Sequence, residues 1–506
     1  MAALYYDWIA SHAQRRPESL AAIDLGTGRR FTYGMFDERI GRLASVLRDA
    51  YGVKRGDRVA VFAPNTTETF EVQFATARLG AVFVPLNWRL ATPELRAILT
   101  DCAPVVLIHD LEFTERAGAL RESFPNMRAC AFGAPGSAYE QAISAAVPLE
   151  AFATVALDDI STILYTSGTT GIPKGAIITH AMNFWNVVNC SSPCGLSRAS
   201  VFLGVLPLFH TGGLNVFANP LFHFGGTVLI MRAFDPGQAL RLIGDPAMGI
   251  THMFGVPAIF QFIGQHPEFT RTDLSRLLFA GVGGAPTPNA ILTAWNEQGV
   301  VLQQGYGMTE TSPIVLILDR EDAIRKLGSA GKPILHGQVK VVRTDGTDAP
   351  PNEVGELWVR GEHITPGYWQ KPDVTAAVFT DGWLHTGDAA TVDDEGFYYI
   401  VDRWKDMYIS GGENVYPAEV ENVLYQIPAL AEASVIGIPD QRWGEVGRAV
   451  VVVRPDMTLN EDEVIAHCAA NLARYKLPHS VVFTDALPRN ATGKVHKPTL
   501  RQQFGG

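Results

Sequence analysis

The first half of the chain alternates short apolar runs with amphipathic segments, and this alternation restricts the fold more than any other feature. Residues 57–63 and 104–109 are typical of buried strands. Thr92 followed by Pro93 predicts a helix through Leu99 with Thr92 as its N-cap. The apolar positions of the helix before the first strand share one face: Phe36, Ile40, Leu43 and Leu47. The pattern predicts a parallel sheet covered by helices on both faces, and a second set of the same kind from about 161 to 304.

The pattern changes near residue 331. Runs at 338–343 and 355–360 alternate in polarity and are separated by turn-forming clusters, which predicts antiparallel, barrel-like structure. After Asp402 we expect a compact α/β module. Its elements are a helix opening at Pro417, strands at 434–438 and 449–453, and a helix at Asn460 with Glu463 completing its capping box.

Composition excludes several classes of protein. A chain of 506 residues is too long for one compact core, so two or more domains are expected. A net charge of −11 argues against a nucleic-acid partner, whose phosphates need basic surfaces. The five cysteines form no metal-binding or disulfide pattern, and no secretory signal or apolar run of membrane-spanning length occurs. We therefore expect a cytoplasmic protein. Peripheral contact with a membrane stays open, and so does the choice between a monomer and a homodimer.

The segment from Tyr165 to Gly175, between two strand-like runs, is rich in Gly, Ser and Thr and holds a single lysine, Lys174. A glycine-rich loop can direct several backbone N–H groups at one anion, and hydroxyls and an ammonium group add donors. It is no Walker A loop, because Lys174 is followed by Gly175 and a strand. A solvated hairpin is the alternative, but Pro173 stiffens the loop and favours a polyphosphate site.

Seven further motifs run in order along the chain: 207–210, 283–286, 305–310, 383–388, 402–406, 410–419 and 488–494. With the loop at 165–175, they resemble the adenylate-forming superfamily, which includes acyl-CoA synthetases, luciferases and peptide-synthetase adenylation domains. The resemblance implies an α/β fold: a large N-terminal domain of two α/β sheets plus a small β-barrel, then a small mobile α+β C-terminal domain. We place these domains at residues 1–402 and 403–506.

The resemblance implies that the chain joins a carboxylic acid to AMP and then transfers the acyl group to a thiol. ATP, Mg²⁺ and coenzyme A are the expected cofactors. Lys494, Thr309, Glu310 and His210 are the predicted catalytic residues, with Glu310 as the Mg²⁺ ligand. The predicted nucleotide and CoA contacts are Thr166, Ser167, Gly168, Thr169, Thr170, Gly171, Lys174, Gly284, Ala285, Pro286, Tyr306, Gly307, Asp388, Arg403, Lys405, Gly411 and Gly412.

These residues have distinct implied roles. Lys494 would contact the carboxylate and the α-phosphate, and Thr309 the α-phosphate. Tyr306 would lie against adenine, while Asp388 and Arg403 would bind the ribose. Lys405 would act as the hinge between the domains, and Gly411 and Gly412 would line the pantetheine tunnel.

The acid is less constrained. Where adenylation domains that bind amino acids carry an aspartate after the phenylalanine, this chain has His210, so an amino acid would lack its ammonium partner. The expected pocket residues are Trp185, His210, Thr211, Gly212, Gly213, Val282, Gly283, Met308 and 313–316. They are apolar or small, which disfavours a diacid as the substrate. The two Gly-Gly pairs would leave volume for a fatty chain or an aromatic ring. We expect medium- or long-chain fatty acids first and hydroxycinnamates or other aryl acids second. A luciferase-like monooxygenase and a non-catalytic nucleotide-binding relative are more distant alternatives.

Overall fold

The computed structural model describes residues 3–166, 173–403, 406–410, 413–490 and 493–505. Its first large sheet has six strands in the order β6-β5-β3-β4-β7-β8, parallel except for the last pair. The strands are β3 (Arg58–Phe62), β4 (Val82–Leu86), β5 (Val106–Asp110), β6 (Arg128–Phe132), β7 (Ile160–Thr166) and β8 (Lys174–Thr179).

The second large sheet has nine strands in the order β15-β14-β13-β12-β11-β9-β10-β1-β2. Its six central strands, from β13 to β1, are parallel, and the strands at its two ends are antiparallel to their neighbours. They are β1 (Leu20–Asp24), β2 (Arg30–Thr32), β9 (Val201–Gly204), β10 (Thr227–Ile230), β11 (His252–Gly255), β12 (Phe279–Gly283), β13 (Leu302–Gly307), β14 (Ile314–Ile317) and β15 (Lys332–Pro333).

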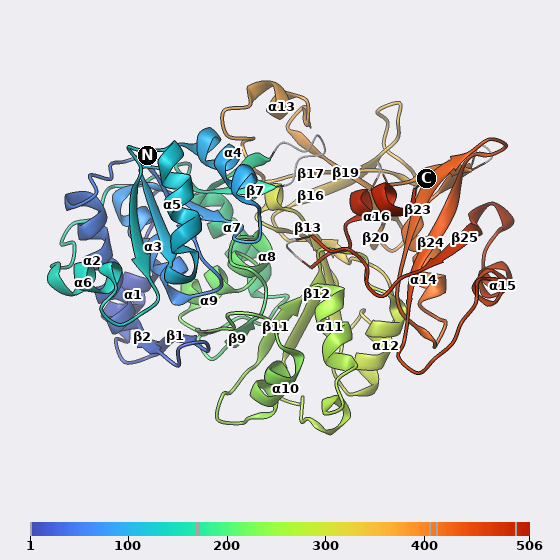
Figure 1. Cartoon of the computed structure of the whole chain (residues 1–506), viewed down its shortest axis with the longest axis horizontal. Coiled ribbons are helices and arrows are strands. Elements are labelled where there is room, and N and C mark those ends of the chain that lie inside the picture. The colour runs from blue at the N-terminus through green and yellow to red at the C-terminus, as the bar shows by residue number, and fades with distance from the viewer. Residues whose placement is uncertain (1–2, 167–172, 404–405, 411–412, 491–492, 506) are drawn as a thin grey trace.

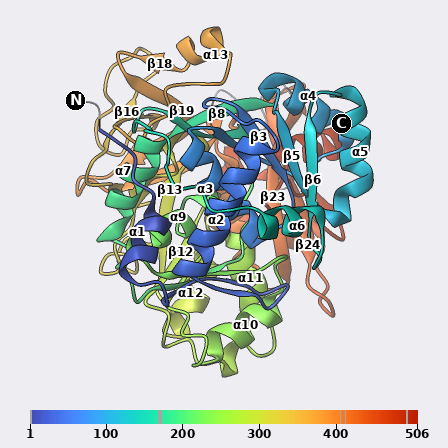
Figure 2. The same cartoon turned by 90° about the vertical axis from the view of Figure 1, so that its left-hand side faces the viewer.

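Helices pack on and between these two sheets. Figure 2 shows α2 and α3 side by side, and the largest core cluster joins Phe36 of α2 and Phe70 of α3 to strands of both sheets. The helices are α1 (Trp8–Arg15), α2 (Tyr33–Asp49), α3 (Thr67–Leu79), α4 (Thr92–Cys102), α5 (Thr114–Ser123), α6 (Ala138–Ala145), α7 (His180–Ser191), α8 (Thr211–Leu214), α9 (Ala218–Phe224), α10 (Pro236–Gly244), α11 (Pro257–Gly264) and α12 (Asn289–Glu297).

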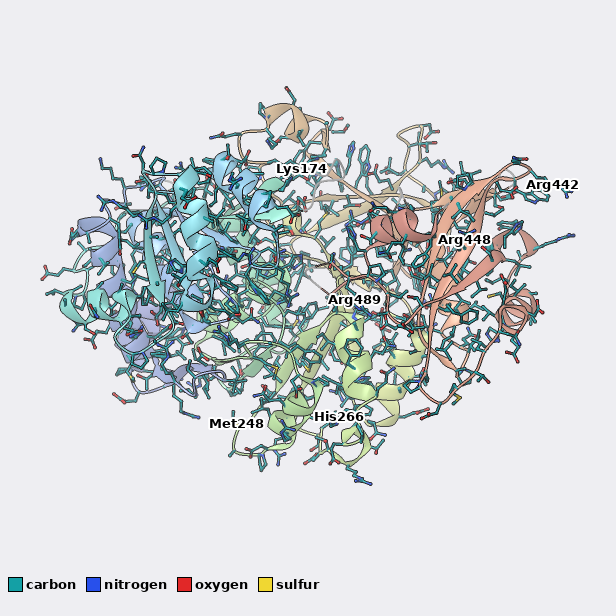
Figure 3. All side chains as sticks on the ribbon, viewed as in Figure 1. Lys174, Met248, His266, Arg442, Arg448 and Arg489 are labelled. Carbon is teal, nitrogen blue, oxygen red and sulfur yellow. The ribbon has the colours of Figure 1, made fainter. Side chains whose placement is uncertain are left out.

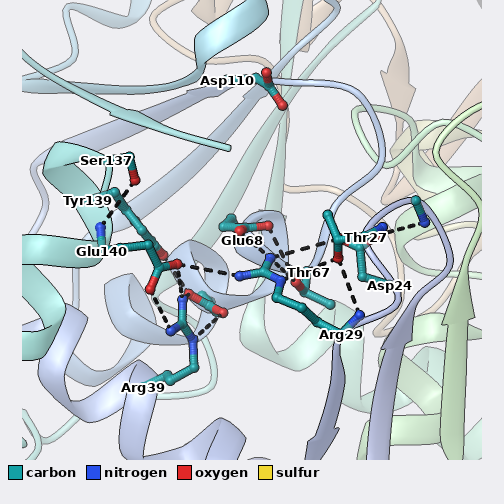
Figure 4. A network of polar contacts seen from close by, with 12 residues as sticks. Asp24, Thr27, Arg29, Arg39, Thr67, Glu68, Asp110, Ser137, Tyr139 and Glu140 are labelled. Atoms are coloured by element: carbon teal, nitrogen blue, oxygen red, sulfur yellow. Dashed lines mark hydrogen bonds and ion pairs between the residues drawn. The ribbon is translucent and has the colours of Figure 1, made fainter. Parts of the chain in front are cut away.

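Because α3 lies between the two sheets, it is buried almost all round, although it carries Glu68, Glu71 and Arg78. Buried charges require partners. Arg39 of α2 pairs with Glu71 through Nε and Nη2 at 2.8 and 3.1 Å and with Glu140 of α6, and Arg29 pairs with Glu68 (Figure 4). We call Arg29, Arg39, Glu68, Glu71 and Glu140 the amino-terminal charge cluster. It ties α2, α3 and α6 together.

The remaining two sheets follow in the second half of the chain, toward the right of Figure 1. An antiparallel sheet contains β16 (Gln338–Val342), β17 (Gly355–Arg360), β18 (Phe379–Thr380), β19 (Trp383–Val392) and β20 (Tyr398–Arg403), beside α13 (Pro372–Ala376). The C-terminal sheet contains β21 (Tyr408–Ser410), β22 (Glu413–Val415), β23 (Leu430–Asp440), β24 (Gly444–Val453) and β25 (Pro478–Phe483), with α14 (Pro417–Leu424), α15 (Glu461–Asn471) and α16 (Lys497–Phe504).

The predicted fold class is confirmed: two α/β sheets and a small antiparallel sheet precede a smaller α+β part. The predicted capping box is present, because Asn460 Oδ1 accepts from the Glu463 N–H and Glu463 accepts from the Asn460 N–H, both at 2.9 Å. The predicted N-cap Thr92 is wrong, because Ala91 caps α4 and its N–H donates to the Glu94 carboxylate at 2.7 Å. The domain division between residues 402 and 403 stays a prediction. Across the described ranges, no helix combines the length and apolarity that a membrane crossing requires.

Candidate active site

Lys494 lies against the end of β12. Its Cε and Nζ are 3.3 and 3.4 Å from the position that a Cβ atom would take on Gly284. Gly284 has φ +81°, so a side chain here would be strained as well as crowded against the lysine. Burial and the charge of Arg403 lower the pKa of Lys494 to about 8, while Asp388 opposes that shift. The lysine is therefore charged at neutral pH but within reach of titration.

A turn in the C-terminal part presents this lysine. The Lys494 N–H donates to Asn490 Oδ1 at 3.0 Å, and its carbonyl accepts from the Asn490 N–H at 2.8 Å. Arg489 donates through Nη1 to the Gly493 carbonyl at 2.7 Å and pairs with Glu432 of β23 at 2.5 Å. The turn is thereby tied to the C-terminal sheet.

Helix α11 contacts the same part of the chain. The Arg489 guanidinium lies 5.8 Å from the ring centroid of Phe262, and the Gln261 side chain donates to the Ala431 carbonyl. Figure 3 shows Arg489 beside α11, near the middle of the molecule. These contacts join the second large sheet to the C-terminal part at the place where Lys494 enters.

Asp388, Tyr306 and Arg403 meet beside this lysine. Asp388 of β19 pairs in register with Arg403 of β20, and the Arg403 Nε to Asp388 Oδ1 distance is 2.7 Å. The Tyr306 hydroxyl donates to Asp388 Oδ2 at 2.5 Å. Burial raises the pKa of Asp388, against the opposing charge of Arg403, and Asp388 in turn raises the pKa of Arg403. We call Tyr306, Asp388, Arg403 and Lys494 the site cluster.

Glu310 and Lys174 both contact one tyrosine, Tyr368. Glu310 is 6% exposed, and its Oε1 accepts from the Tyr368 hydroxyl at 2.7 Å. The Lys174 ammonium lies 5.5 Å from the Tyr368 ring centroid. Strand β8 holds this arrangement, because Ala176 pairs with Tyr368. A buried carboxylate fits a Mg²⁺ ion that it would share with phosphate oxygens, and the Lys174 ammonium could contact the same phosphate.

His210 is a neutral imidazole in this environment. Its Nδ1 accepts from the Gly212 N–H at 3.1 Å, which places the ring proton on Nε2. Burial first, and the Lys494 charge second, lower the pKa of His210 to about 3. The ring can therefore donate a hydrogen bond to an anion but cannot carry a positive charge near pH 7.

The structure brings together most of the predicted site residues that it describes. Gly284, Ala285 and Pro286 follow the end of β12 and are exposed or half-buried, and Gly307 ends β13. Thr309 is buried beside Glu310, and the half-buried Thr166 ends β7 opposite Lys174. The other predicted contacts lie outside the described residues: Ser167, Gly168, Thr169, Thr170, Gly171, Lys405, Gly411 and Gly412.

Two predicted pocket features are wrong. A Cβ on Gly213 would lie 2.3 Å from the Pro207 carbonyl oxygen, and one on Gly283 would lie 2.5 Å from that of Gly305. These glycines permit close backbone packing and do not open space for an acyl group. Val282 is fully buried in the core of the second large sheet, and its place in the acid pocket stays a prediction.

Some residues of the site were not predicted. Tyr368 binds Glu310 and faces Lys174, and Gln261 and Phe262 contact the C-terminal part. The sequence signal for Tyr368 is weak, a tyrosine after the turn-forming pair Pro366-Gly367. Phe262 has no sequence signal, because its 37% exposure is visible only in the structure.

Comparison with known proteins places the chain within one family. Residues 9–369 match the AMP-binding enzyme family and residues 419–494 match the AMP-binding enzyme C-terminal domain. A feruloyl-CoA synthase from Amycolatopsis sp. is 43% identical over 498 residues, covering 98% of both chains. An indoleacetate–CoA ligase from Aromatoleum aromaticum is 40% identical over 502 residues, covering 98% of this chain and 97% of the relative.

A relative that is named for a different acid has a somewhat lower sequence identity. A long-chain-fatty-acid–CoA ligase from Mycobacterium tuberculosis is 38% identical over 489 residues, covering 96% of both chains. Among solved structures, ATP-bound MatB from Rhodopseudomonas palustris superimposes with a TM-score of 0.92 at 31% identity, covering 100% of this chain and 99% of that one.

Proposed function

The chain belongs to the AMP-binding enzyme family and is an AMP-forming carboxylate–CoA ligase that uses ATP, Mg²⁺ and coenzyme A, and we propose that its acid is an aryl acid of the hydroxycinnamate kind. The observation that carries the proposal is the 43% identity to a feruloyl-CoA synthase over 98% of both chains. Fatty acids, the first expectation from the sequence, are less well supported, because the fatty-acid ligase is 38% identical. The order of the two alternatives is therefore reversed.

In the first half-reaction, a carboxylate oxygen of the acid attacks the α-phosphorus of ATP and pyrophosphate leaves. Two anions must approach each other, so a preorganised cation between them lowers the barrier. Lys494 is our choice for this group, because it is charged near neutral pH and is held against Gly284. The neutral His210 donates from Nε2 to the acid carboxylate, which orients it without adding a second charge.

The nucleotide is held by groups on four strands, β8, β13, β19 and β20, and on the turn that follows β13. Asp388 and Arg403 bind the ribose hydroxyls, Tyr306 lies along the adenine, and Lys174 and Thr309 contact phosphate oxygens. Glu310 would hold the Mg²⁺ ion, with Tyr368 fixing the orientation of its carboxylate. When bound, Mg²⁺ neutralises phosphate charge.

In the second half-reaction, the CoA thiolate attacks the acyl carbonyl carbon and AMP leaves. Lys494 belongs to the C-terminal part, so removing it from the site after the first step would make room for another group. We propose that the contacts of α11 with Arg489 and Ala431 favour the arrangement seen here, in which Lys494 is inserted. This arrangement suits the first half-reaction.

The test is a comparison of kcat/KM for CoA-thioester formation on ferulate, 4-coumarate, indoleacetate, octanoate and palmitate, with products identified by mass. Ferulate or 4-coumarate should exceed both fatty acids by at least about tenfold, which corresponds to roughly 1.4 kcal/mol. A preference for octanoate or palmitate would reject the aryl-acid proposal and leave the ligase assignment intact.

A further inference from the structure

A cavity of about 550 Å³ lies outside the site, between the amino-terminal segment, α1, α7 and the end of α9. Its walls are mainly aromatic and include Tyr5, Tyr6, Trp8 and Phe184. The volume is within the range of small-molecule sites in proteins. Helix α7 separates the cavity from the site, because Asn183 accepts from Ser312 beside β14 at 3.4 Å while His180 and Phe184 line the cavity.

Two histidines form part of the aromatic wall, and each has a ring nitrogen that is closed to solvent and unpaired among the residues that the structure describes. His180 is 3% exposed, and its Nε2 has no hydrogen-bond partner within the described part of the chain; the same holds for Nδ1 of His223. Tyr5 packs on His180 with ring centroids 4.2 Å apart, and Trp8 packs edge-on to His223 at 5.1 Å. Burial lowers the pKa of both histidines, so each is a neutral ring with one donor and one acceptor nitrogen.

Positive charge collects at one end of the cavity. A smaller cavity of about 110 Å³ shares His12 and Arg15 with it and adds Arg16 and Arg198. All three arginines are exposed, and none forms an ion pair with a residue that the structure describes. Arginines gathered around a small hollow without carboxylate partners are suited to bind an anion.

We propose that this cavity is a second binding site for a planar aromatic carboxylate, separate from the site where the acid is activated. The ring of the ligand stacks among the aromatic walls. The carboxylate lies toward Arg15 and the arginines beyond it. A fatty acid would satisfy the cationic end, but its chain would lack the stacking that a planar ring gains on these walls.

Radiolabelled ferulate is the probe in equilibrium dialysis with the full-length protein. The acid-activating site is blocked in half of the samples with 5′-O-(N-feruloylsulfamoyl)adenosine, a mimic of the acyl-adenylate. We expect two equivalents of bound ferulate without the mimic and one with it. Ser11→Trp, which fills the cavity from α1, should abolish the equivalent that the mimic does not displace.

Arg15→Gln changes an exposed side chain and should weaken the same equivalent about tenfold while leaving thermal stability unchanged. Arg96→Gln, an exposed arginine on α4 away from the cavity, is the matched control and should leave ferulate binding as in the wild type. Melting curves for all three variants separate loss of binding from loss of fold.

The second site is rejected if the mimic displaces all bound ferulate, or if Ser11→Trp folds normally and keeps the mimic-resistant equivalent. It is also rejected if ferulate does not bind there and anionic lipid vesicles bind in a manner that depends on Arg15, since the surface would then contact membranes. One mimic-resistant equivalent that Ser11→Trp removes supports the second site even if ferulate is no substrate. Failure of ferulate as a substrate would reject the aryl-acid proposal and leave the second site supported.

Discussion

The amino-terminal charge cluster and the site cluster differ in how completely their charged members are paired. In the amino-terminal charge cluster, Glu71 is fully buried, and it accepts two hydrogen bonds from Arg39 and one from the Tyr139 hydroxyl at 2.7 Å. In the site cluster, Asp388 accepts a hydrogen bond from Tyr306 and forms an ion pair with Arg403. The pKa of the Lys494 ammonium, by contrast, is lowered.

The difference follows from what each cluster must do. Charges that only join helices are most stabilising when every one is paired, since a buried unpaired charge is costly. A site that brings ATP and a carboxylate together needs an excess of positive charge in the absence of its ligands. The site cluster has two cations for one carboxylate, whereas the amino-terminal cluster has two arginines for three glutamates.

The largest effect is expected at Lys494. Lys494→Ala should slow formation of the acyl-adenylate by about 10²-fold or more, because one preorganised charge contact is lost. Thioester formation from supplied acyl-adenylate should change much less. Pyrophosphate release and single-turnover thioester formation measure the two steps. Lys476→Ala, which removes another partly buried lysine of the C-terminal part, is the control, and equal losses in both steps for Lys494→Ala would contradict the assignment.

The amino-terminal cluster should instead affect stability. Arg39→Ala leaves Glu71 and Glu140 without their main partner and should lower the free energy of unfolding by about 3 kcal/mol, as for other broken buried pairs. Urea denaturation measures this loss. The catalytic rate per folded molecule should stay near that of the wild type. The exposed Arg48–Asp49 pair supplies the control, since Arg48→Ala should leave the urea midpoint unchanged.

The pH dependence should distinguish the clusters further. Lys494 has a pKa of about 8, so its charge is present below that pH and is lost above it. The kcat/KM of the first half-reaction, which reports the ligand-free enzyme, should fall as the pH rises through about 8 and be roughly tenfold below its plateau near pH 9. The Lys494→Ala variant should lack this limb. If the variant also lost rate with a midpoint near pH 8, the titrating group would be another residue.

The smallest effect is expected at α11. Phe262→Ala removes the contact with Arg489 and should slow the first half-reaction about three- to fivefold, since cation–π contacts at exposed sites contribute roughly 0.5–1 kcal/mol. The second half-reaction should be unchanged or faster. Leu278→Ala, at another exposed apolar residue of the same sheet region, serves as control. A slower second half-reaction in Phe262→Ala would show that the contact does not favour one arrangement.

The sequence predicted the kinds of elements well, because hydrophobic periodicity is local. It predicted neither the pairing of β1 with β10, which joins residues about 200 positions apart, nor the amino-terminal charge cluster. Arg39 and Glu140 are separated by 101 residues, and each alone is typical of a solvated surface. The motifs pointed to Asp388, Arg403 and Lys494, but they did not predict the contact between Tyr368 and Glu310. They also did not show why glycine is needed at 213 and 283, because the close backbone atoms belong to other segments.

The coupling between His210 and Lys494 makes the histidine a built-in reporter of where the C-terminal part lies. Because the lysine charge contributes to the low pKa of His210, withdrawing the lysine must raise that pKa, although burial would still hold it below the usual value. By thermodynamic reciprocity, a proton on His210 would oppose insertion of the lysine. The pKa of one imidazole ring, measured by titration with Lys494 inserted and withdrawn, would therefore report where that lysine lies.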